Sequence, residues 1–258
     1  MSLPRLIVVS LHKAGTHLAL RLVEELGYQR RFFGDEMLES VRRDPPEQFL
    51  ATFEPAAAYF LHECRADRIP RPLLDHWREK WDPAFIFQYR DPRAVLLSQV
   101  NYLRGSHRRG TFSNTPYHLV FSDALRAQPT ERDALDVAIR GMGEYLEESF
   151  LGSVWMRYHP NVLQLRFERL AGGRGGGSDA EQLEDVERTL RHLGLSGDAK
   201  QIASRLYDPS QPTFHRGTID AWRDVYTPEQ LQLFERRYGH ILDAYGYPRA
   251  QDLPPVRR

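Results

Sequence analysis

The segment LIVVSLHKAGTHLALRLV (Leu6 to Val23) decides the fold class of this chain. A nearly continuous apolar, β-branched run over residues 5–11 is typical of a strand that is buried on both faces of a parallel sheet. A short basic turn follows, and the apolar spacing behind it fits a buried helix, which we expect Thr16 to cap. The segment therefore predicts a strand, a loop and a helix in that order.

The rest of the chain repeats this alternation of strand and helix. The predicted strands are residues 5–11, 57–62, 84–90 and 161–170. The predicted helices are residues 71–81, 93–104, 131–151, 180–194, 199–206 and 227–246. Because strands and helices alternate, we expect an α/β fold of three layers, with helices on both faces of a central, mostly parallel sheet.

The length of 258 residues predicts a single domain over 1–258. Within it, residues 105–129 are rich in turn formers, and a long irregular segment of this kind is typically a functional lid or is disordered. We expect a mobile lid or substrate loop there. The glycine-rich residues 172–178 are expected to form a flexible hinge or linker.

Charge and cysteine content exclude several classes of function. Lys plus Arg and Asp plus Glu both number 35, so no net field attracts nucleic acid or an anionic membrane, and any anion site must be local. Cys64 is the sole cysteine, which excludes an internal disulfide and a multi-thiolate zinc site. No apolar run approaches the ~20 residues of a membrane span, and we expect a soluble, cytoplasmic protein without stable membrane insertion.

The first turn, HKAG, has the composition of an anion-binding loop. A buried strand that enters a helix through a glycine turn brings unpaired backbone N–H groups and the positive helix end together. The Walker pattern is not satisfied, because Gly15 follows Lys13 and no earlier glycine stands in the turn. Two interpretations of this motif alone stay open, an anion site and an ordinary connection with a solvated lysine.

A second basic position follows the strand predicted over 84–90. Arg90 stands at its carboxyl end, where open α/β sheets bind ligands, and Ser98 lies about two turns along the next helix. An arginine fork with a nearby hydroxyl suits a phosphate monoester. The alternative is a surface arginine paired with Asp91.

Taken in order, these motifs resemble those of the sulfotransferases that use 3′-phosphoadenosine-5′-phosphosulfate (PAPS). LHKAGTHLALRLVEELGY resembles their 5′-phosphosulfate loop, which commonly begins P-K-[SA]-G-T, and FIFQYRDPRAVLLSQVNY is similar to their 3′-phosphate segment. VLQLRFERLAG is similar to the family strand that ends R-[YF]-E-D-L, and FHRGTIDAWRDVYTPEQ to the carboxyl-terminal R-K-G-x-x-G-D-W segment. The resemblance runs from residue 5 to about 230 and implies the topology of P-loop nucleotide kinases.

The resemblance also implies roles for particular residues. Lys13 would contact the oxygen between phosphate and sulfate, and the remaining site residues would hold the nucleotide. These are Ala14, Gly15, Thr16 and His17 at the 5′ end, Arg90, Ser98, Arg216 and Gly217 at the 3′-phosphate, and Phe167 beside the adenine. In the first loop His17 and Leu18 replace the usual Thr or Asn and Trp or Phe, so the aromatic stack that this loop usually supplies to the adenine is missing. In the last motif Ala221 stands where the family usually has Asp.

Sulfuryl transfer needs in-line positioning, charge stabilisation on the leaving phosphate and a base for the acceptor proton. The family uses a histidine or a glutamate as base, and HECR at the end of the strand before the arginine strand offers His62 and Glu63. We favour His62, because its ordinary pKa makes a neutral proton acceptor available at neutral pH. No histidine cluster has the spacing of a metal site, so we expect no metal.

Aromatic side chains in the lid segment are candidates for acceptor binding, namely Tyr102, Phe112 and Tyr117. The expected function is transfer of a sulfuryl group from PAPS to a hydroxyl or amine of a small-molecule, lipid or natural-product acceptor by a bacterial-type enzyme, with adenosine 3′,5′-bisphosphate (PAP) as product. Two alternatives stay open, a nucleotide kinase or other phosphoryl transferase with a degenerate loop, and an inactive nucleotide-binding scaffold. The oligomeric state is not determined by the sequence.

Overall fold

The computed structural model describes residues 2–33, 43–105, 116–207 and 219–253. Its contacts divide the chain into two compact units. One comprises residues 1–90 with 152–219, and the other comprises residues 91–151 with 220–258. Both units are built from two separate stretches of the chain. That they act as the single domain expected over 1–258 stays a prediction.

The first unit contains a five-stranded, entirely parallel sheet with the order β2-β3-β1-β4-β5. The strands are β1 (Leu6–Ser10), β2 (Gln29–Phe32), β3 (Ala57–Leu61), β4 (Ala84–Tyr89) and β5 (Val162–Arg166). The β1 strand lies at the centre of the sheet, between β3 and β4. The prediction of a central, mostly parallel sheet is confirmed.

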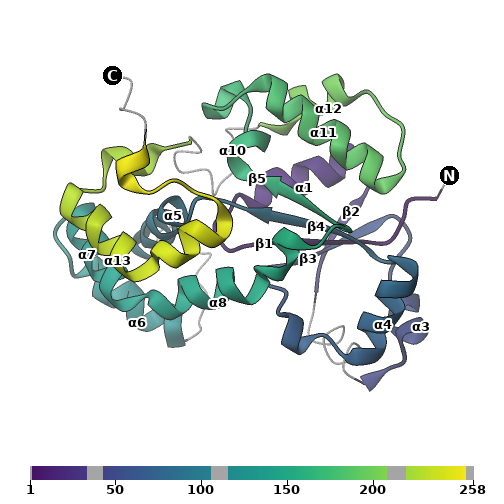
Figure 1. Cartoon of the computed structure of the whole chain (residues 1–258), viewed down its shortest axis with the longest axis horizontal. Helices are drawn as coiled ribbons and strands as arrows, with labels where there is room; N and C mark the ends of the chain where they lie inside the picture. Colours follow the sequence, from purple (N-terminus) through teal and green to yellow (C-terminus); the bar gives the residue numbers. More distant parts are fainter. Residues whose placement is uncertain (1, 34–42, 106–115, 208–218, 254–258) are drawn as a thin grey trace. The chain divides into compact units, whose positions relative to one another are not determined.

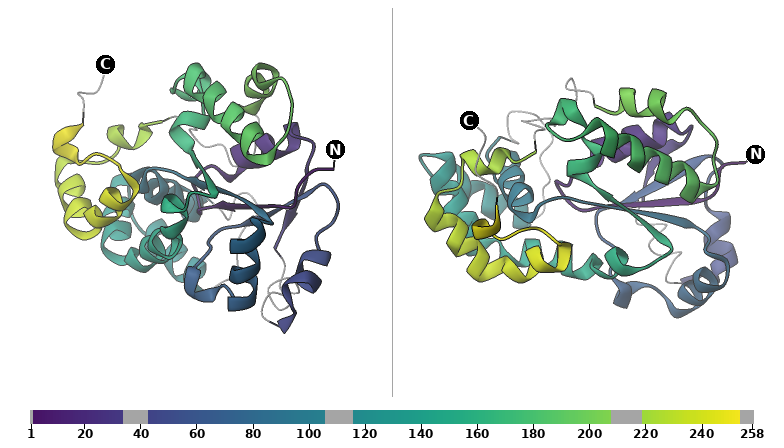
Figure 2. Two further views of the ribbon diagram at one scale, coloured as in Figure 1. Left: turned by 45° about the vertical axis from the view of Figure 1, so that its right-hand side comes forward. Right: turned by 45° about the horizontal axis from the view of Figure 1, so that its top comes forward.

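Helices cover both faces of this sheet (Figures 1 and 2). One face carries α1 (Thr16–Glu25), α11 (Asp179–Leu193) and α12 (Ala199–Leu206), and the other carries α3 (Pro46–Ala51) and α4 (Arg71–Lys80). Short helical segments of this unit are η1 (Ala66–Arg68), α9 (Trp155–Tyr158), α10 (Phe167–Leu170) and η3 (Gly173–Gly175). Because β1 has a helical layer on each side, all of its residues are buried, as its apolar run predicts.

The second unit is helical in its described part. Its helices are α5 (Pro92–Gly105), α6 (Pro116–Arg126), α7 (Glu131–Gly141), α8 (Gly143–Ser153), η4 (Ala221–Asp224), α13 (Pro228–Tyr245) and η5 (Ala250–Asp252). The α5 helix packs against α6 and α7, and α13 packs against α5 and α7. Thr227 caps α13 by accepting a hydrogen bond from the Gln230 N–H, and Pro228 follows in the first turn.

A buried arginine organises the start of the second unit. The Arg93 side chain is fully buried, and its Nε and Nη2 atoms donate to the Asp91 carboxylate at 3.0 and 2.8 Å. Its guanidinium also lies 4.1 Å from the centre of the Trp222 ring. The Asp91 carboxylate thus holds Arg93 in the interior of this unit. The two interpretations of Arg90 stay open.

Two expectations about helices are corrected. Residues 116–126 form α6, although the sequence predicts an irregular segment over 105–129. The single helix expected over 131–151 is divided into α7 and α8 at Met142. Gly143 follows the break, and a Cβ there would lie 3.0 Å from Oη of Tyr238, so the glycine permits the close approach of α13.

The sheet also departs from its predicted strands. The β2 strand was not predicted, because its sequence QRRF is polar and mostly exposed, as expected of a strand at the edge of a sheet. The strand expected over 161–170 is shorter, since the chain turns into α10 at Phe167. In the glycine-rich segment, a Cβ on Gly177 would lie 2.6 Å from the Glu168 carbonyl oxygen, so glycine allows close backbone packing there.

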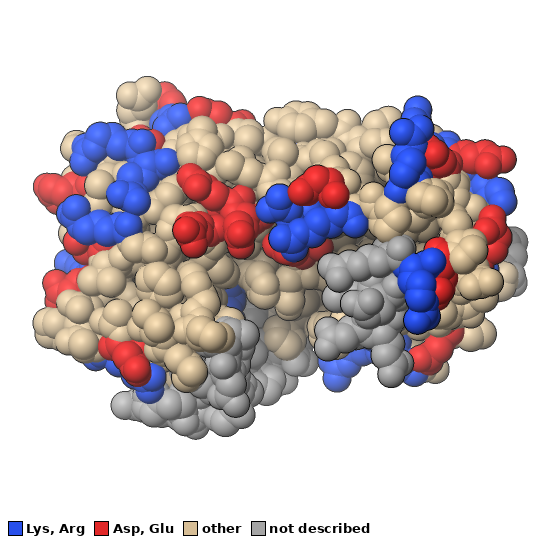
Figure 3. All heavy atoms as spheres, turned by 90° about the horizontal axis from the view of Figure 1, so that it is seen from below, with Lys and Arg blue, Asp and Glu red and all other residues tan. Residues whose placement is uncertain are grey.

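Acidic and basic side chains are interspersed on the face drawn in Figure 3. This distribution agrees with the equal numbers of acidic and basic residues in the chain. In the described ranges, no helix combines the length and the apolar character that crossing a membrane requires.

Candidate functional site

The loop between β1 and α1 has two residues in the left-handed region, Lys13 with φ 60° and Gly15 with φ 92°. Such a conformation costs a non-glycine residue about 1–2 kcal/mol, and strain of this kind is concentrated at functional sites. Turns that contain left-handed residues direct successive backbone N–H groups into one concavity, which suits an anion. The main chain of the loop is closed by the Ala14 N–H, which donates to the Leu11 carbonyl oxygen at 2.9 Å.

The start of α1 differs from the prediction. Gly15, not Thr16, is the N-cap residue, and Thr16 is the first helical residue, whose hydroxyl shares a 2.9 Å hydrogen bond with that of Ser10. No side chain in the described part of the chain caps α1, and its first turn contains no acidic residue. The helix therefore presents its positive end and N–H groups beside Lys13, as an anion site requires.

Gly15 is required at its position for two reasons. Its φ of 92° is unfavourable for any residue with a Cβ, and a Cβ there would lie 2.4 Å from Cδ2 of Phe167. The Phe167 ring therefore packs directly against the backbone of the loop. The Phe167 ring is only 5% exposed. Its contact with the loop connects the start of α10 with the start of α1.

The side-chain amide of Gln88 on β4 is buried and forms hydrogen bonds to the same loop. Its Nε2 donates to the carbonyl oxygens of Ala14 and Gly15, both at 3.2 Å. Gln88 is fully buried, and an amide side chain in an apolar interior is stable only when its polar atoms are bonded. Because these carbonyls are directed towards Gln88, we infer that the amide fixes the orientation of the peptide groups that form the turn.

Arg90 and Phe167, which the sequence analysis singled out separately, lie together. The Arg90 guanidinium is 4.1 Å from the centre of the Phe167 ring. The register of the sheet explains this contact, because Tyr89 on β4 pairs with Arg166 on β5, and Arg90 and Phe167 are the next residues of the two strands. The strand ends thus bring a cation, an aromatic ring and the glycine of the loop into contact.

His62 follows β3, which is the neighbour of β1 on the other side. Its Nδ1 lies 3.1 Å from the Ser10 carbonyl oxygen, and its ring is stacked on that of His12, with 4.0 Å between the ring centres. A carbonyl oxygen only accepts hydrogen bonds, so Nδ1 carries the hydrogen and Nε2 of the neutral ring has the lone pair. The Glu63 carboxylate instead accepts a hydrogen bond from Nη1 of Arg68 at 3.1 Å.

Electrostatics favour the neutral form of His62. Burial lowers its pKa below 6.5, and the Lys13 ammonium lowers it further, against the opposing effects of the Ser10 carbonyl and the Glu63 carboxylate. Desolvation also lowers the pKa of His17, together with the cations of Lys13 and Arg30. Since the lowered pKa keeps the His62 ring neutral at neutral pH, its Nε2 lone pair is available to accept a proton there.

The remaining predicted residues lie elsewhere or outside the described ranges. In the second unit, Ser98 and Tyr102 lie on α5 and are half-buried. Tyr117 lies on α6, where its ring packs against Phe121 at 4.7 Å. Phe112, Arg216 and Gly217 fall outside the described residues. The roles expected for all of these residues stay predictions.

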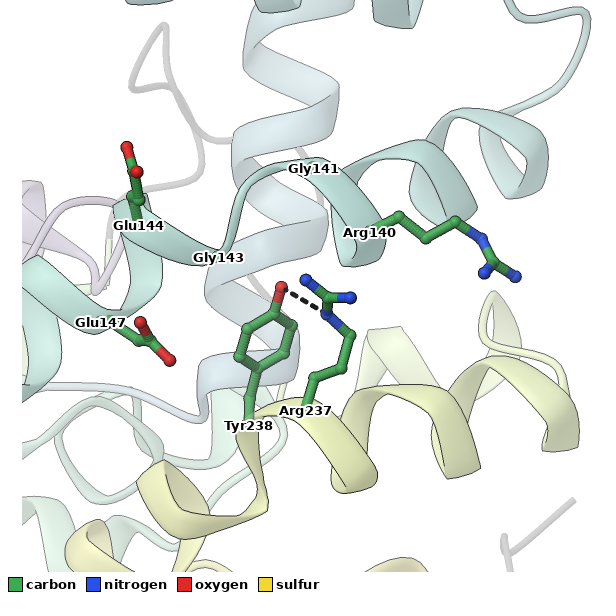
Figure 4. A pocket seen from close by; sticks show the side chains of 7 residues that line it. All are labelled: Arg140, Gly141, Gly143, Glu144, Glu147, Arg237 and Tyr238. Atoms are coloured by element: carbon green, nitrogen blue, oxygen red, sulfur yellow. Dashed lines mark hydrogen bonds between the residues drawn. The ribbon is translucent and has the colours of Figure 1, made fainter.

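A cavity of about 480 Å³ lies within the second unit, at the break between α7 and α8. Figure 4 shows Arg237 donating from Nε to Oη of Tyr238 at one side of this cavity, at 3.3 Å. The lining residues are Arg140, Gly141, Gly143, Glu144, Glu147, Arg237 and Tyr238. None of them is a predicted site residue. A second cavity of about 400 Å³ lies beside α11 and α12 in the first unit.

The sequence motifs identify neither Gln88 as part of the site nor a role for His12. A polar amide inside the apolar run AFIFQYR is a signal that a buried partner exists. His12 carries no comparable signal, because its contact with His62 depends on the pairing of β1 with β3.

No protein-family model and no curated protein sequence matches this chain. Among solved structures, it is similar to the mouse sulfotransferase SULT7A1 complexed with PAP, with a TM-score of 0.59 and 16% sequence identity. The similarity covers 93% of this chain and 84% of the mouse chain. At this identity the comparison establishes the fold, and the fold agrees with the topology that the sequence motifs imply.

Proposed function

We propose that the protein is a sulfotransferase that moves a sulfuryl group from PAPS to a hydroxyl or amine of a small-molecule, lipid or natural-product acceptor. The observation that carries this proposal is the turn between β1 and α1, where Lys13 and Gly15 are left-handed and Phe167 packs on Gly15 beneath Arg90. The ordered sequence motifs support it, and so does the likeness to a structure that was solved with PAP.

The residues of the first unit suit an anionic nucleotide. The turn has no room for a Cβ at position 15 and lies at an uncapped helix start beside Lys13, so its backbone N–H groups are candidates for the 5′-phosphosulfate. Arg90 is the candidate for the 3′-phosphate, since a guanidinium binds phosphate through paired hydrogen bonds. Ser98, Arg216 and Gly217 would complete that phosphate site, and Phe167 would lie by the adenine.

The chemistry that we assign uses two side chains. PAPS supplies an activated sulfuryl group, whose bond from sulfur to the phosphate oxygen breaks as the acceptor oxygen or nitrogen bonds to sulfur. Lys13 stabilises the negative charge that remains on the phosphate, and Nε2 of His62 takes the acceptor proton. We prefer His62 to Glu63 as the base, because Glu63 is bonded to Arg68. The products are the sulfated acceptor and PAP.

Calorimetric titration of PAP, with ADP as comparison, tests the proposal directly. We expect the protein to bind PAP more tightly than ADP. Arg90→Ala should remove about 1.5–3 kcal/mol of PAP binding, the usual contribution of a charged hydrogen bond, and should abolish the preference for PAP over ADP. Lys13→Ala should weaken the binding of both PAP and ADP, because both nucleotides carry phosphate at the 5′ position.

Matched controls are available on α4 of the same unit. Arg78 and Lys80 are exposed on this helix. Arg78→Ala and Lys80→Ala therefore remove one arginine and one lysine charge from the first unit, as the two test variants do, but at positions outside the β1–α1 loop. Both controls should bind PAP as the unsubstituted protein does. Absence of PAP binding, or equal affinity for PAP and ADP, would overturn the proposal. Binding of ATP with magnesium would then favour a phosphoryl transferase.

The finer parts of the proposal rest on the sequence. We place the enzyme in the cytoplasm and consider it bacterial-type, with a small-molecule or lipid acceptor, no nucleic-acid partner and no metal. Tyr102, Phe112 and Tyr117 are the proposed acceptor contacts, and residues 105–129 are the proposed substrate segment, which includes α6. Screening of phenols, alcohols and amines with labelled PAPS would identify the acceptor class.

A further inference from the structure

The stacked pair His12 and His62 results from the pairing of two neighbouring strands. Val9 on β1 pairs with Leu61 on β3, so the residues that follow these two strands meet at the same edge of the sheet. The ring of His12, two residues beyond Ser10, lies over that of His62 with 4.0 Å between centres and 25° between ring planes. One face of the His62 ring is therefore covered by the loop that contains Lys13.

The other constraint on His62 is its hydrogen bond to the Ser10 carbonyl oxygen, at 3.1 Å from Nδ1. A histidine ring rotates about two side-chain bonds, and one hydrogen bond leaves the ring free to tilt about the bonded atom. A flat contact over one face opposes that tilt, because stacked rings lose contact when either one rotates. The stack and the hydrogen bond together hold Nδ1 inward and leave Nε2 as the available proton acceptor.

We propose that His12 is a positioning residue for the general base His62, holding its ring in the orientation and tautomer in which Nε2 accepts the acceptor proton. This inference rests on the proposed function for the role of His62 as the base, although the geometry of the pair does not depend on it. His12 stands where the pattern quoted for the sulfotransferases begins with proline, so this support would be a feature of this chain.

The charges around His62 are compatible with this arrangement. Burial is the main cause of the lowered pKa of His62, the hydrogen bond to the Ser10 carbonyl opposes it, and Lys13 on the loop lowers the pKa while Glu63 raises it. Glu63 is itself bonded to Arg68.

The first test is spectroscopic and needs no substrate. Long-range ¹H–¹⁵N spectra of ligand-free protein should show neutral His62 with its hydrogen on Nδ1. His12→Ala should reduce the population of that tautomer, and His12→Phe, which keeps a flat ring, should restore it. His159→Ala is the matched control, because that ring also packs on an aromatic neighbour of the first unit, Trp77 at 4.6 Å, and its loss should leave the His62 signals unchanged.

The second test is kinetic, with PAPS as donor and 4-nitrophenol as probe acceptor. His12→Ala should lower kcat about ten- to a hundredfold, the usual effect of a misplaced catalytic group, with KM for PAPS unchanged, and His12→Phe should recover most of the loss. The inference is overturned if the His12→Ala variant is folded, as its thermal melt shows, and its His62 tautomer is unchanged. Absence of sulfation by the unsubstituted protein would show that 4-nitrophenol is not an acceptor, the PAP titration would still decide the proposed function, and the spectra would still decide the role of His12.

Discussion

Single residues set the conformation of the proposed anion loop. Gly15 combines a positive φ with contact to Phe167, and Lys13 adopts a left-handed conformation that carries a cost for a side chain with a Cβ. A loop that retains such a lysine has a geometry imposed by its surroundings, which agrees with a binding role. The cost of a side chain at position 15 therefore has two parts, backbone strain and steric overlap with Phe167, and a second glycine with the same φ allows the two to be separated.

We expect Gly15→Ala to destabilise the protein more than Gly27→Ala does. Both glycines have φ of 92°, so both substitutions carry about 1–2 kcal/mol of backbone strain. Only at position 15 would the Cβ overlap a ring, at 2.4 Å from Phe167, whereas at position 27 the nearest atom is Cδ1 of Leu3 at 3.9 Å. Urea unfolding of the two variants measures the difference, and calorimetry should show loss of PAP binding for Gly15→Ala only.

Equal destabilisation of the two variants would mean that Phe167 moves aside without cost. Full retention of PAP affinity by a folded Gly15→Ala protein would remove the loop from the proposed site. Either result is informative, because Gly27 matches the conformation of Gly15 and lies at the other end of α1.

At the scale of whole elements, the residues of the candidate site lie at the carboxyl ends of β1, β3, β4 and β5. The strand order places β1 between β3 and β4, so the β1 loop has His62 on one side and Arg90 on the other. Gln88 joins β4 to this loop through two hydrogen bonds, and it is the contact by which one strand controls the conformation at the end of another.

Gln88→Leu should reduce the free energy of unfolding by about 1–3 kcal/mol, because two buried carbonyl oxygens lose their donor. The matched control is Gln182→Leu, which removes a buried amide that donates to the Leu170 carbonyl oxygen at 2.8 Å. Both variants should be less stable in urea, but only Gln88→Leu should also weaken PAP binding. If both variants bind PAP normally, Gln88 supports the fold alone.

At the scale of the whole molecule, several histidines have lowered pKa values. Burial is the first cause at His62, His159 and His192, and nearby cations add to it at His62 and His192. All of them belong to the first unit. A histidine with a lowered pKa binds fewer protons in the folded protein than in the unfolded chain, so the pH dependence of stability follows from these groups.

We expect the protein to lose stability as the pH falls below about 6.5, the pKa of histidine in an unfolded chain. Between the lowered and ordinary pKa values the unfolded chain binds more protons, so the free energy of unfolding rises with pH by up to about 1.4 kcal/mol per pH unit and proton. Urea unfolding between pH 5.5 and 7.5 measures this slope.

Two substitutions assign that slope to particular residues. Nε2 of His192 lies 3.0 Å from the Phe85 carbonyl oxygen. A glutamine amide can still donate to that oxygen but does not titrate, so His192→Gln should reduce the slope of stability against pH. His62→Gln should flatten it in the same way. A slope that is unchanged in both variants would show that these histidines do not control the acid stability of the protein.

The sequence by itself determined the parallel α/β architecture, the glycine turn between β1 and α1, and the position of Arg90 directly after β4. Each of these features is encoded by a local pattern, such as the apolar run of β1, the glycine of the first turn, or the residue after a buried strand. The carboxyl ends of β3 and β4 follow from the same patterns, because polar residues end their buried runs, whereas β5 ends before its predicted limit where the chain turns into α10.

Only the tertiary structure decided the remaining features. The edge strand β2 lacks an apolar run, because its side chains are mostly exposed and its pairing with β3 alone defines it. The break between α7 and α8 lies against Tyr238, which is far along the chain, and the stack of His12 on His62 depends on strand order. Contacts between residues distant in sequence leave no periodic signal, so their partners become known only when the chain is folded.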